Sequence, residues 1–129
     1  MTEIRLEHVS YAYDDEKILE DINLQVTSGE VVSILGPSGV GKTTLFNLIA
    51  GILEVQSGRI VLDGEENPKG RVSYMLQKDL LLEHKTVLGN IILPLLIQKV
   101  DKAEAIAKAD EILATFQLTA VRDKYPHEL

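Results

Sequence analysis

The sequence contains no cysteine and no tryptophan, and only 5% of its 129 residues are aromatic. Without cysteine, a disulfide framework and a thiolate metal site are both excluded. The three histidines, His8, His84 and His127, are scattered and do not have the spacing of metal ligands. We therefore predict no metal centre built from cysteine or histidine, and we interpret all three histidines as non-catalytic.

Basic residues are in the minority. The chain has 13 Lys and Arg residues against 20 Asp and Glu residues, which gives a net charge of −7. Nucleic-acid binding usually needs a basic stripe that displaces counterions from the phosphate backbone. We therefore expect no nucleic-acid partner.

Long hydrophobic runs are also lacking. The longest, residues 91–97, contains Pro94 and is far shorter than the roughly 20 residues of a membrane-spanning helix. The first residues, Met1 to Arg5, do not have the basic start and apolar stretch of a secretory signal. The sequence predicts a cytoplasmic chain that does not cross a membrane itself, although a partner could hold it against one.

What the sequence does contain is 45% hydrophobic residues, enough for one compact domain or part of one. Segments 4–9 and 18–26 alternate as strands of a half-buried sheet do, with Ile4, Leu6 and, less cleanly, His8 on one side of the first. Residues 31–35 form a nearly continuous β-branched run, typical of a strand covered on both faces. This run predicts a central strand of an α/β core.

Further strands are expected at residues 59–62 and 71–76, the first closed by a tight turn at Asp63-Gly64. Helical spacing of apolar residues predicts three helices, at residues 43–50, 86–97 and 103–116. The last helix is expected to bury one face, made of Ile106, Ala109, Leu113 and Phe116. Strands therefore dominate the first part of the chain and helices the second.

A glycine-rich loop joins the expected central strand to the first helix. It fits the pattern G-x-x-x-x-G-K-[ST] at every fixed position, and that pattern would recur by chance in roughly 0.4% of chains of this length. The matching residues are Gly36-Pro37-Ser38-Gly39-Val40-Gly41-Lys42-Thr43. The motif and its context predict a phosphate-binding loop of the Walker A type.

The residue types of this loop explain the chemistry. Glycines let successive backbone N–H groups turn toward a phosphate, next to the positive end of the following helix. Lys42 would bring a mobile positive charge to the phosphates, and Thr43 would offer a hydroxyl to Mg²⁺. The alternative is a plain glycine loop with a solvated lysine.

Together these stretches resemble ATP-binding-cassette (ABC) domains over essentially the whole chain. The loop continues with Thr44-Leu45 as in that family, while Val40 replaces the small polar residue usual at its position. Further landmarks follow in the family's order: Ala50-Gly51, Gln56-Ser57-Gly58-Arg59-Ile60 and Leu62-Asp63-Gly64.

The resemblance implies an α/β fold, a P-loop NTPase of the ABC type that is only partial. It comprises an N-terminal antiparallel β subdomain, the front part of a parallel-sheet core and the start of a helical subdomain. We expect residues 1–129 to form an incomplete nucleotide-binding domain, with the β-rich subdomain and P-loop core in residues 1–77 and the helical part in residues 78–129.

The resemblance also implies ATP and Mg²⁺ as cofactors. In the family an aromatic residue stacks on adenine, and Tyr13 occupies the matching place, with Tyr11 as a rival and strand packing as the alternative role. The residues expected to bind the nucleotide are Tyr13, Gly36, Ser38, Gly39, Val40, Gly41, Lys42, Thr43 and Thr44.

Gln77 resembles the family's glutamine that touches Mg²⁺ and the attacking water and that acts as a hinge for the helical subdomain. The resemblance therefore implies Lys42 and Gln77 as catalytic residues, and Thr43 and Gln77 as metal ligands. The alternative for Gln77 is an ordinary surface glutamine.

Residues 79–85 and 91–97 lie where family members receive a helix of a transmembrane permease. Packing in the subdomain core is the preferred interpretation for Ile91, Leu95 and Leu96. The consecutive residues Leu80, Leu81 and Leu82 are the expected exposed contacts, because three leucines in a row cannot all face one small core.

The end of the sequence, residues 125–129, resembles the lead-in to the family signature Leu-Ser-Gly-Gly-Gln, of which only Leu129 is present. In the family, two nucleotide-binding domains pair head to tail, and each phosphate loop faces the partner's signature. We expect this chain to bind nucleotide weakly or partially and not to hydrolyse it alone.

The predicted function is that of the ATP-binding subunit of an ABC transporter, peripheral on the inner face of the cell membrane through its permease. An alternative is a soluble ABC-type ATPase related to translation or repair factors, which would be favoured by long insertions that this sequence lacks. A phosphate-loop kinase or GTPase is a third alternative, but it would lack the adenine-stacking Tyr13 and the context of Gln77.

Overall fold

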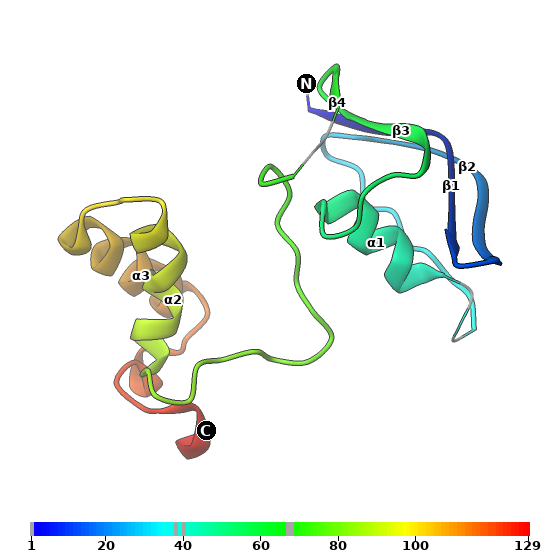
Figure 1. Cartoon of the computed structure of the whole chain (residues 1–129). Coiled ribbons are helices and arrows are strands. Elements are labelled where there is room, and N and C mark those ends of the chain that lie inside the picture. Colours follow the sequence, from blue (N-terminus) through cyan, green and yellow to red (C-terminus); the bar gives the residue numbers. More distant parts are fainter. Residues whose placement is uncertain (1, 38, 40, 67–68) are drawn as a thin grey trace. The chain divides into compact units, whose positions relative to one another are not determined.

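A computed structural model describes residues 2–37, 39, 41–66 and 69–129 of the chain. These residues divide into two compact units, Met1–Met75 and Leu76–Leu129, and each is described by itself (Figure 1).

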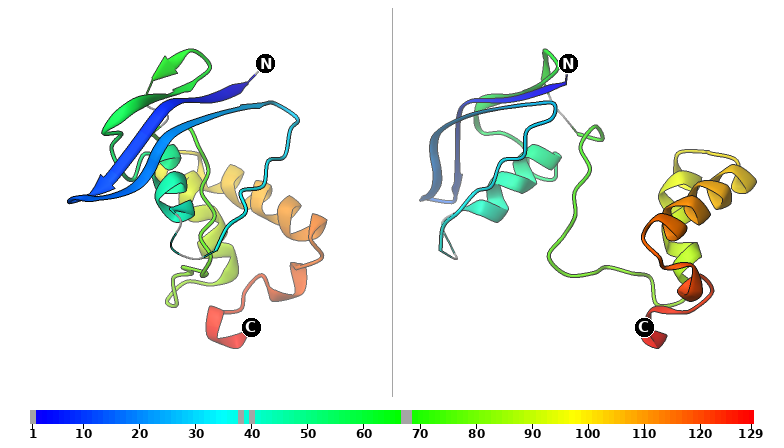
Figure 2. Two further views of the ribbon diagram at one scale, coloured as in Figure 1. Left: turned by 90° about the vertical axis from the view of Figure 1, so that its right-hand side faces the viewer. Right: turned by 180° about the vertical axis from the view of Figure 1, so that it is seen from behind.

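The first unit contains a four-stranded antiparallel sheet in the order β2-β1-β3-β4. Its strands are β1 (Glu3–Tyr13), β2 (Glu16–Thr27), β3 (Ser57–Leu62) and β4 (Glu65–Glu66). β1 and β2 form a long hairpin, and β3 returns from much later in the chain to pair with the other edge of β1 (Figure 2).

A bulge in β1 changes the predicted inward and outward pattern. Leu6 and Val9 are both buried although they are three residues apart, because the pairing register shifts between them. His8, expected on the inner side, is instead exposed and has φ 50. The extra residue of a bulge reverses the alternation beyond it, so Val9 replaces His8 in the core.

Gly58 of β3 fits against this bulge. A Cβ atom at Gly58 would lie 2.2 Å from the carbonyl oxygen of His8, and the φ angle of Gly58 is +79. Only glycine allows the two backbones to approach this closely.

The predicted tight turn at Asp63-Gly64 is confirmed. It joins β3 to β4, and both residues have positive φ, 51 and 81. Two positive φ angles in a two-residue hairpin loop match the right-handed twist of the strands.

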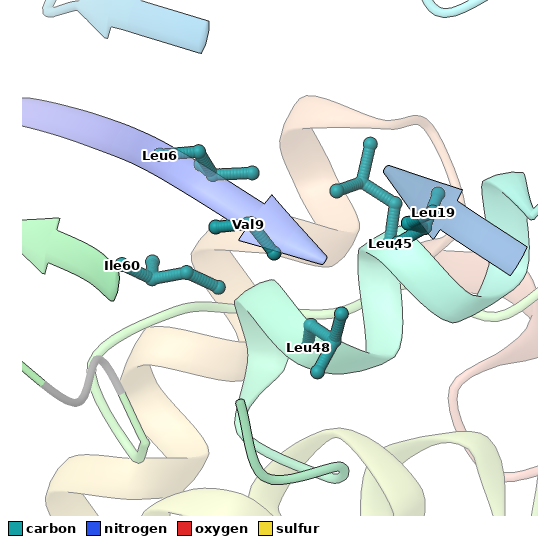
Figure 3. Close-up of a cluster of buried hydrophobic side chains, with 6 residues drawn as sticks. All are labelled: Leu6, Val9, Leu19, Leu45, Leu48 and Ile60. Carbon is teal, nitrogen blue, oxygen red and sulfur yellow. The ribbon is translucent and has the colours of Figure 1, made fainter. Parts of the chain in front are cut away.

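One helix packs against the sheet of the first unit. Helix α1 (Lys42–Ala50) covers one face, in agreement with the predicted helix at 43–50, and ends at Gly51 with φ 78. The core between helix and sheet is formed by six buried residues (Figure 3). They are Leu6, Val9, Leu19, Leu45, Leu48 and Ile60.

The predicted central strand at residues 31–35 is not formed. This segment pairs with no strand among the described residues, and Val31 and Leu35 are 95% and 91% exposed, although Ile34 packs against the core. Residues 71–76, also predicted as a strand, are likewise irregular. A β-branched run favours a strand, but a strand forms only where a neighbour completes its hydrogen-bond ladder.

The second unit is helical, with α2 (Val87–Ile97), α3 (Lys102–Thr115) and two short 3₁₀ turns, η1 (Thr119–Val121) and η2 (Pro126–Glu128). Both helices agree with the predicted ranges within a residue. Ile92 of α2 is buried with Ala105 and Ala109 of α3, whose small side chains allow the two helices to pack closely.

The predicted buried face of α3 needs one correction. Ala105, Ala109 and Leu113 are buried at intervals of four residues, and Ile106 is half-buried. Phe116 is 68% exposed, because the helix ends at Thr115 and Phe116 no longer continues the helical spacing of the buried face.

The leucines considered for partner contact behave differently from one another. Leu80 is 70% exposed and Leu81 is also exposed, but Leu82 is half-buried. Ile91 and Leu95 pack against the core as expected, whereas Leu96 is exposed. Among the described residues, no helix has both the length and the apolar character needed to cross a membrane.

Candidate functional site

The glycine-rich loop of the first unit rests directly on β2. Gly41, with φ 96, is the residue that precedes α1. A Cβ atom at Gly41 would lie 2.8 Å from Cγ2 of Ile18 and 3.0 Å from Cδ2 of Leu19. The second fixed glycine of the motif is therefore required both by its backbone angle and by its contact with β2.

The start of α1 differs from the starts of the other two helices. Thr86 accepts a hydrogen bond from the N–H of Gly89 in α2, at 3.1 Å, and Asp101 accepts one from Ala103 in α3, also at 3.1 Å. Among the described residues, no side chain caps α1. Its first N–H groups, at the positive end of the helix dipole, remain available to an anion.

Lys42, the first residue of α1, bends back over the loop. Its Nζ donates a hydrogen bond to the carbonyl oxygen of Gly36. This contact brings the first and last parts of the motif together around the start of the helix. An anionic ligand would offer the ammonium group a stronger, charge-assisted partner than a carbonyl oxygen.

The remaining loop residues have different environments. Thr43 is exposed in the first turn of α1, and Thr44 is buried. Gly39 has φ 86. Ser38 and Val40, both predicted to bind nucleotide, lie outside the described residues.

The two candidate stacking residues lie together at the end of β1. The rings of Tyr11 and Tyr13 meet edge to face, with centroids 5.1 Å apart. Tyr11 is half-buried against the core, whereas Tyr13 is 46% exposed. Tyr13 therefore offers the more accessible ring, and its stacking role stays a prediction.

Sequence reasoning assigned no role to Gln56, which the structure places beside these tyrosines. Its Oε1 accepts a hydrogen bond from the N–H of Ala12 at 2.9 Å, and its Nε2 donates one to the carbonyl oxygen of Ala12 at 3.0 Å. The two residues are 44 positions apart, so no local sequence signal could have revealed the contact.

Gln77, the other predicted catalytic residue, is exposed and belongs to the second unit. The structure therefore assigns no distance between Gln77 and the phosphate loop, and its role stays a prediction.

The electrostatic features with shifted pKa values lie outside the loop. A hydrogen bond from His8 lowers the pKa of Asp21, where the two side chains meet at 2.6 Å. A hydrogen bond from Arg59 similarly lowers the pKa of Glu7. Both pairs join side chains of neighbouring strands of the sheet.

The described residues contain no cluster of three or more histidine or acidic side chains that could hold a metal ion. A Mg²⁺ ion bound with nucleotide needs less, because phosphate and water supply most of its oxygen ligands. Thr43, exposed in the first turn of α1, carries a hydroxyl of the kind that such an ion takes from a protein.

The sequence profile of the ABC transporter family matches residues 19–129. The chain belongs to the ABC transporter family. That match includes the loop, α1 and the helical unit, and the fold is part of the ABC-type P-loop fold.

Curated ABC relatives align with nearly the whole chain. It is 38% identical to the spermidine/putrescine import ATP-binding protein PotA of Aggregatibacter actinomycetemcomitans, over 98% of the chain and 35% of the relative. It is also 38% identical to the trehalose import ATP-binding protein SugC of Mycobacterium tuberculosis, over all of the chain and 34% of the relative. An uncharacterized ABC transporter ATP-binding protein of Bacillus subtilis, YtlC, is 37% identical, and the chain covers 52% of it. The chain thus spans about a third to a half of the length of these relatives.

Solved ABC structures show the same fold. An ATP-binding cassette of an ABC transporter aligns with a TM-score of 0.83 and 27% identity, over all of this chain and 59% of the other. A dimeric cassette in a post-hydrolysis state with ADP and Pi aligns with a TM-score of 0.78 and 26% identity, over 98% and 62%.

Proposed function

We propose that this chain binds ATP with Mg²⁺ as part of the ATP-binding subunit of an ABC transporter. The observation that carries the proposal is the Walker A loop resting on β2, with Lys42 folded over it at the uncapped start of α1. In the whole protein, ATP binding and hydrolysis would be coupled to transport across a membrane.

Each residue of the site has a distinct task in this proposal. The glycines at 36, 39 and 41, with Ser38, Val40 and Thr44, form the cradle for the phosphates, and Lys42 neutralises their charge. Thr43 holds the Mg²⁺, and Tyr13 stacks on the adenine. The metal ion, when bound, offsets the negative charge of the phosphates.

Hydrolysis needs a positioned water molecule as well as a phosphate cradle. We assign that task in part to Gln77, as a ligand of Mg²⁺ and a neighbour of the water. We further propose that residues 1–77 act as the β-rich subdomain with the P-loop core and residues 78–129 as helical subdomain. The 129-residue polypeptide alone is expected to bind ATP without turning it over.

The names of the relatives support a transport role. Two are import ATP-binding proteins, and one solved cassette is dimeric. We therefore propose a transmembrane permease and a second nucleotide-binding domain, paired head to tail, as the partners. Attachment to the permease would place the protein on the inner face of the cell membrane.

The test is a comparison of ATP, GTP and tripolyphosphate binding by the wild-type chain, by Lys42→Ala and by the control Lys108→Ala. Lys108 is an exposed lysine of α3 that pairs with Glu104 at 2.9 Å. Loss of a charge-assisted contact should weaken binding of all three ligands by about 10- to 100-fold in Lys42→Ala only.

Other outcomes would contradict the proposal. Equal binding by Lys42→Ala and wild type would exclude the phosphate loop as the site. GTP binding as tight as ATP binding would argue against adenine recognition. Lys42-dependent hydrolysis by the polypeptide alone would refute its predicted inactivity.

A further inference from the structure

β1 loses its backbone neighbour on one side before it ends. Its pairing with β3 runs from Ile4 and Leu62 to Ser10 and Ser57, where β3 begins. Its pairing with β2 continues to Tyr13 and Glu16. The last residues of β1 are therefore an edge strand toward β3, and such an edge has unpaired backbone groups.

Gln56 satisfies these groups at one residue. Its side-chain amide accepts from the N–H of Ala12 at 2.9 Å and donates to the carbonyl of Ala12 at 3.0 Å. A carboxamide has the same donor and acceptor as a peptide unit, so it can take the place of one residue of a neighbouring strand. Gln56, directly before β3, thus extends the ladder by one residue through its side chain.

The residue that Gln56 holds lies between the two tyrosines. In a strand, neighbouring residues direct their hydrogen-bonding groups to opposite sides. The N–H and the carbonyl of Ala12 bond to the side chain of Gln56. On the opposite side of β1, Tyr11 is paired with Leu19 of β2, and Tyr13 is paired with Glu16. Gln56 and β2 therefore hold this short segment from both sides.

The position of this segment matters for the nucleotide. Leu19, the partner of Tyr11, lies next to Gly41 of the phosphate loop, where an added Cβ atom would come within 3.0 Å of Cδ2 of Leu19. The end of β1, β2 and the loop form one continuous set of contacts, so a displacement of the strand end would move the exposed ring of Tyr13 relative to the loop. A stacking ring stabilises a bound base best when it is held in place beforehand.

We propose that Gln56 is a positioning residue for adenine recognition, which holds the end of β1 so that Tyr13 can stack while the loop binds the phosphates. The inference rests on the proposed function. Because Gln56 does not contact the loop residues in any described hydrogen bond, its removal should affect the base-dependent part of the affinity and spare the phosphate-dependent part.

The test uses Gln56→Met, which keeps the length of the side chain and removes both hydrogen bonds. The matched control is Gln25→Met, because Gln25 of β2 is also an exposed glutamine, and its Nε2 donates to a side-chain oxygen of Glu3, at 2.9 Å, rather than to backbone. Affinities for ATP and for tripolyphosphate are measured for both variants, together with hydrogen exchange of the Ala12 amide.

We expect Gln56→Met to bind ATP about three- to tenfold more weakly, since two exposed hydrogen bonds are lost. Tripolyphosphate affinity should stay within about twofold of wild type, and the Ala12 amide should exchange faster. Gln25→Met should match wild type in all three measurements.

Three results would overturn the inference: unchanged ATP affinity, equal weakening for both ligands, or loss of the folded state, because each denies Gln56 a local task at the base. A wild-type chain that binds neither ligand would refute the proposed function, and the inference with it. A wild-type chain that binds both, next to an unaffected Gln56→Met variant, would refute the inference alone.

Discussion

The two units of the molecule build their cores in different ways. In the first, Leu6 and Ile60 meet although more than fifty positions separate them, because three strands and a helix converge. In the second, Ile92, Ala105 and Ala109 meet across two consecutive helices. The first unit depends on glycines that let backbones approach closely, and the second on capped helix ends and small core residues.

The units nevertheless share one feature, a side-chain amide that forms hydrogen bonds with backbone groups in place of a backbone partner. Gln56 does this for Ala12 in the first unit. In the second, Oδ1 of Asn90 accepts from the N–H of Leu82 at 2.8 Å, and its Nδ2 donates to the carbonyls of Leu82, Lys85 and Thr86. Gln56 bonds the side of β1 that β3 no longer covers, and Asn90 bonds an irregular segment, but Asn90 is half-buried and Gln56 is exposed.

The largest effect is expected from Gly58→Ala, which tests the role of close backbone approach. The new Cβ would meet the His8 carbonyl, and the positive φ adds strain, so we expect a loss of about 4 kcal/mol in the free energy of unfolding. Urea unfolding followed by circular dichroism measures it.

Gly70→Ala is the matched control for this change, because Gly70 has the same φ of +79 but open space around it. It should cost only about 1 kcal/mol. Equal losses for the two variants would show that the contact with the bulge is unimportant.

A pair of core truncations tests the contrast between the units. Leu48→Ala and Leu113→Ala remove almost fully buried side chains, one in each unit, and each should cost about 3 kcal/mol. Hydrogen exchange should show the largest loss of protection in residues 3–66 for Leu48→Ala and in residues 87–115 for Leu113→Ala. The reverse pattern would contradict the assignment of the two cores.

Asn90→Ala tests the side-chain amide that bonds to backbone groups in the second unit. Removal of the amide takes away the partner of the Leu82 N–H and of the Lys85 carbonyl, both in half-buried residues, so we expect a loss of about 2 kcal/mol. Amide exchange at Leu82 should accelerate with it. Unchanged exchange at Leu82 would argue that the segment is ordered by other contacts.

The smallest effect concerns the ion pair between Asp110 of α3 and Arg122, joined at 2.6 Å. The hydrogen bond from Arg122 lowers the pKa of Asp110. A carboxyl with a lowered folded-state pKa adds stability above its unfolded pKa, and this stability is lost as the pH falls through the folded pKa. NMR titration should show the pKa of Asp110 rising in Arg122→Gln, and an unchanged pKa would refute the coupling.

Local patterns in the sequence predicted the features whose causes are local. The helices at 43–50, 86–97 and 103–116, the turn at Asp63-Gly64 and the strands in segments 4–9, 18–26 and 59–62 all formed close to their predicted positions. The loop from Gly36 to Thr43 was predicted from its spacing and its context, because the chemistry of phosphate binding restricts the residue type at each fixed position, and its binding role stays a prediction.

Tertiary structure decided the features that depend on a distant partner. Residues 31–35 have strand-forming side chains but no paired neighbour among the described residues, so they stay irregular. The bulge at His8 and the close approach of Gly58 require each other across the sheet. The hydrogen bonds between Gln56 and Ala12 also depend on a distant partner. The two residues are 44 positions apart, so no periodic pattern in the sequence indicates the contact, and only the folded chain brings donor and acceptor together.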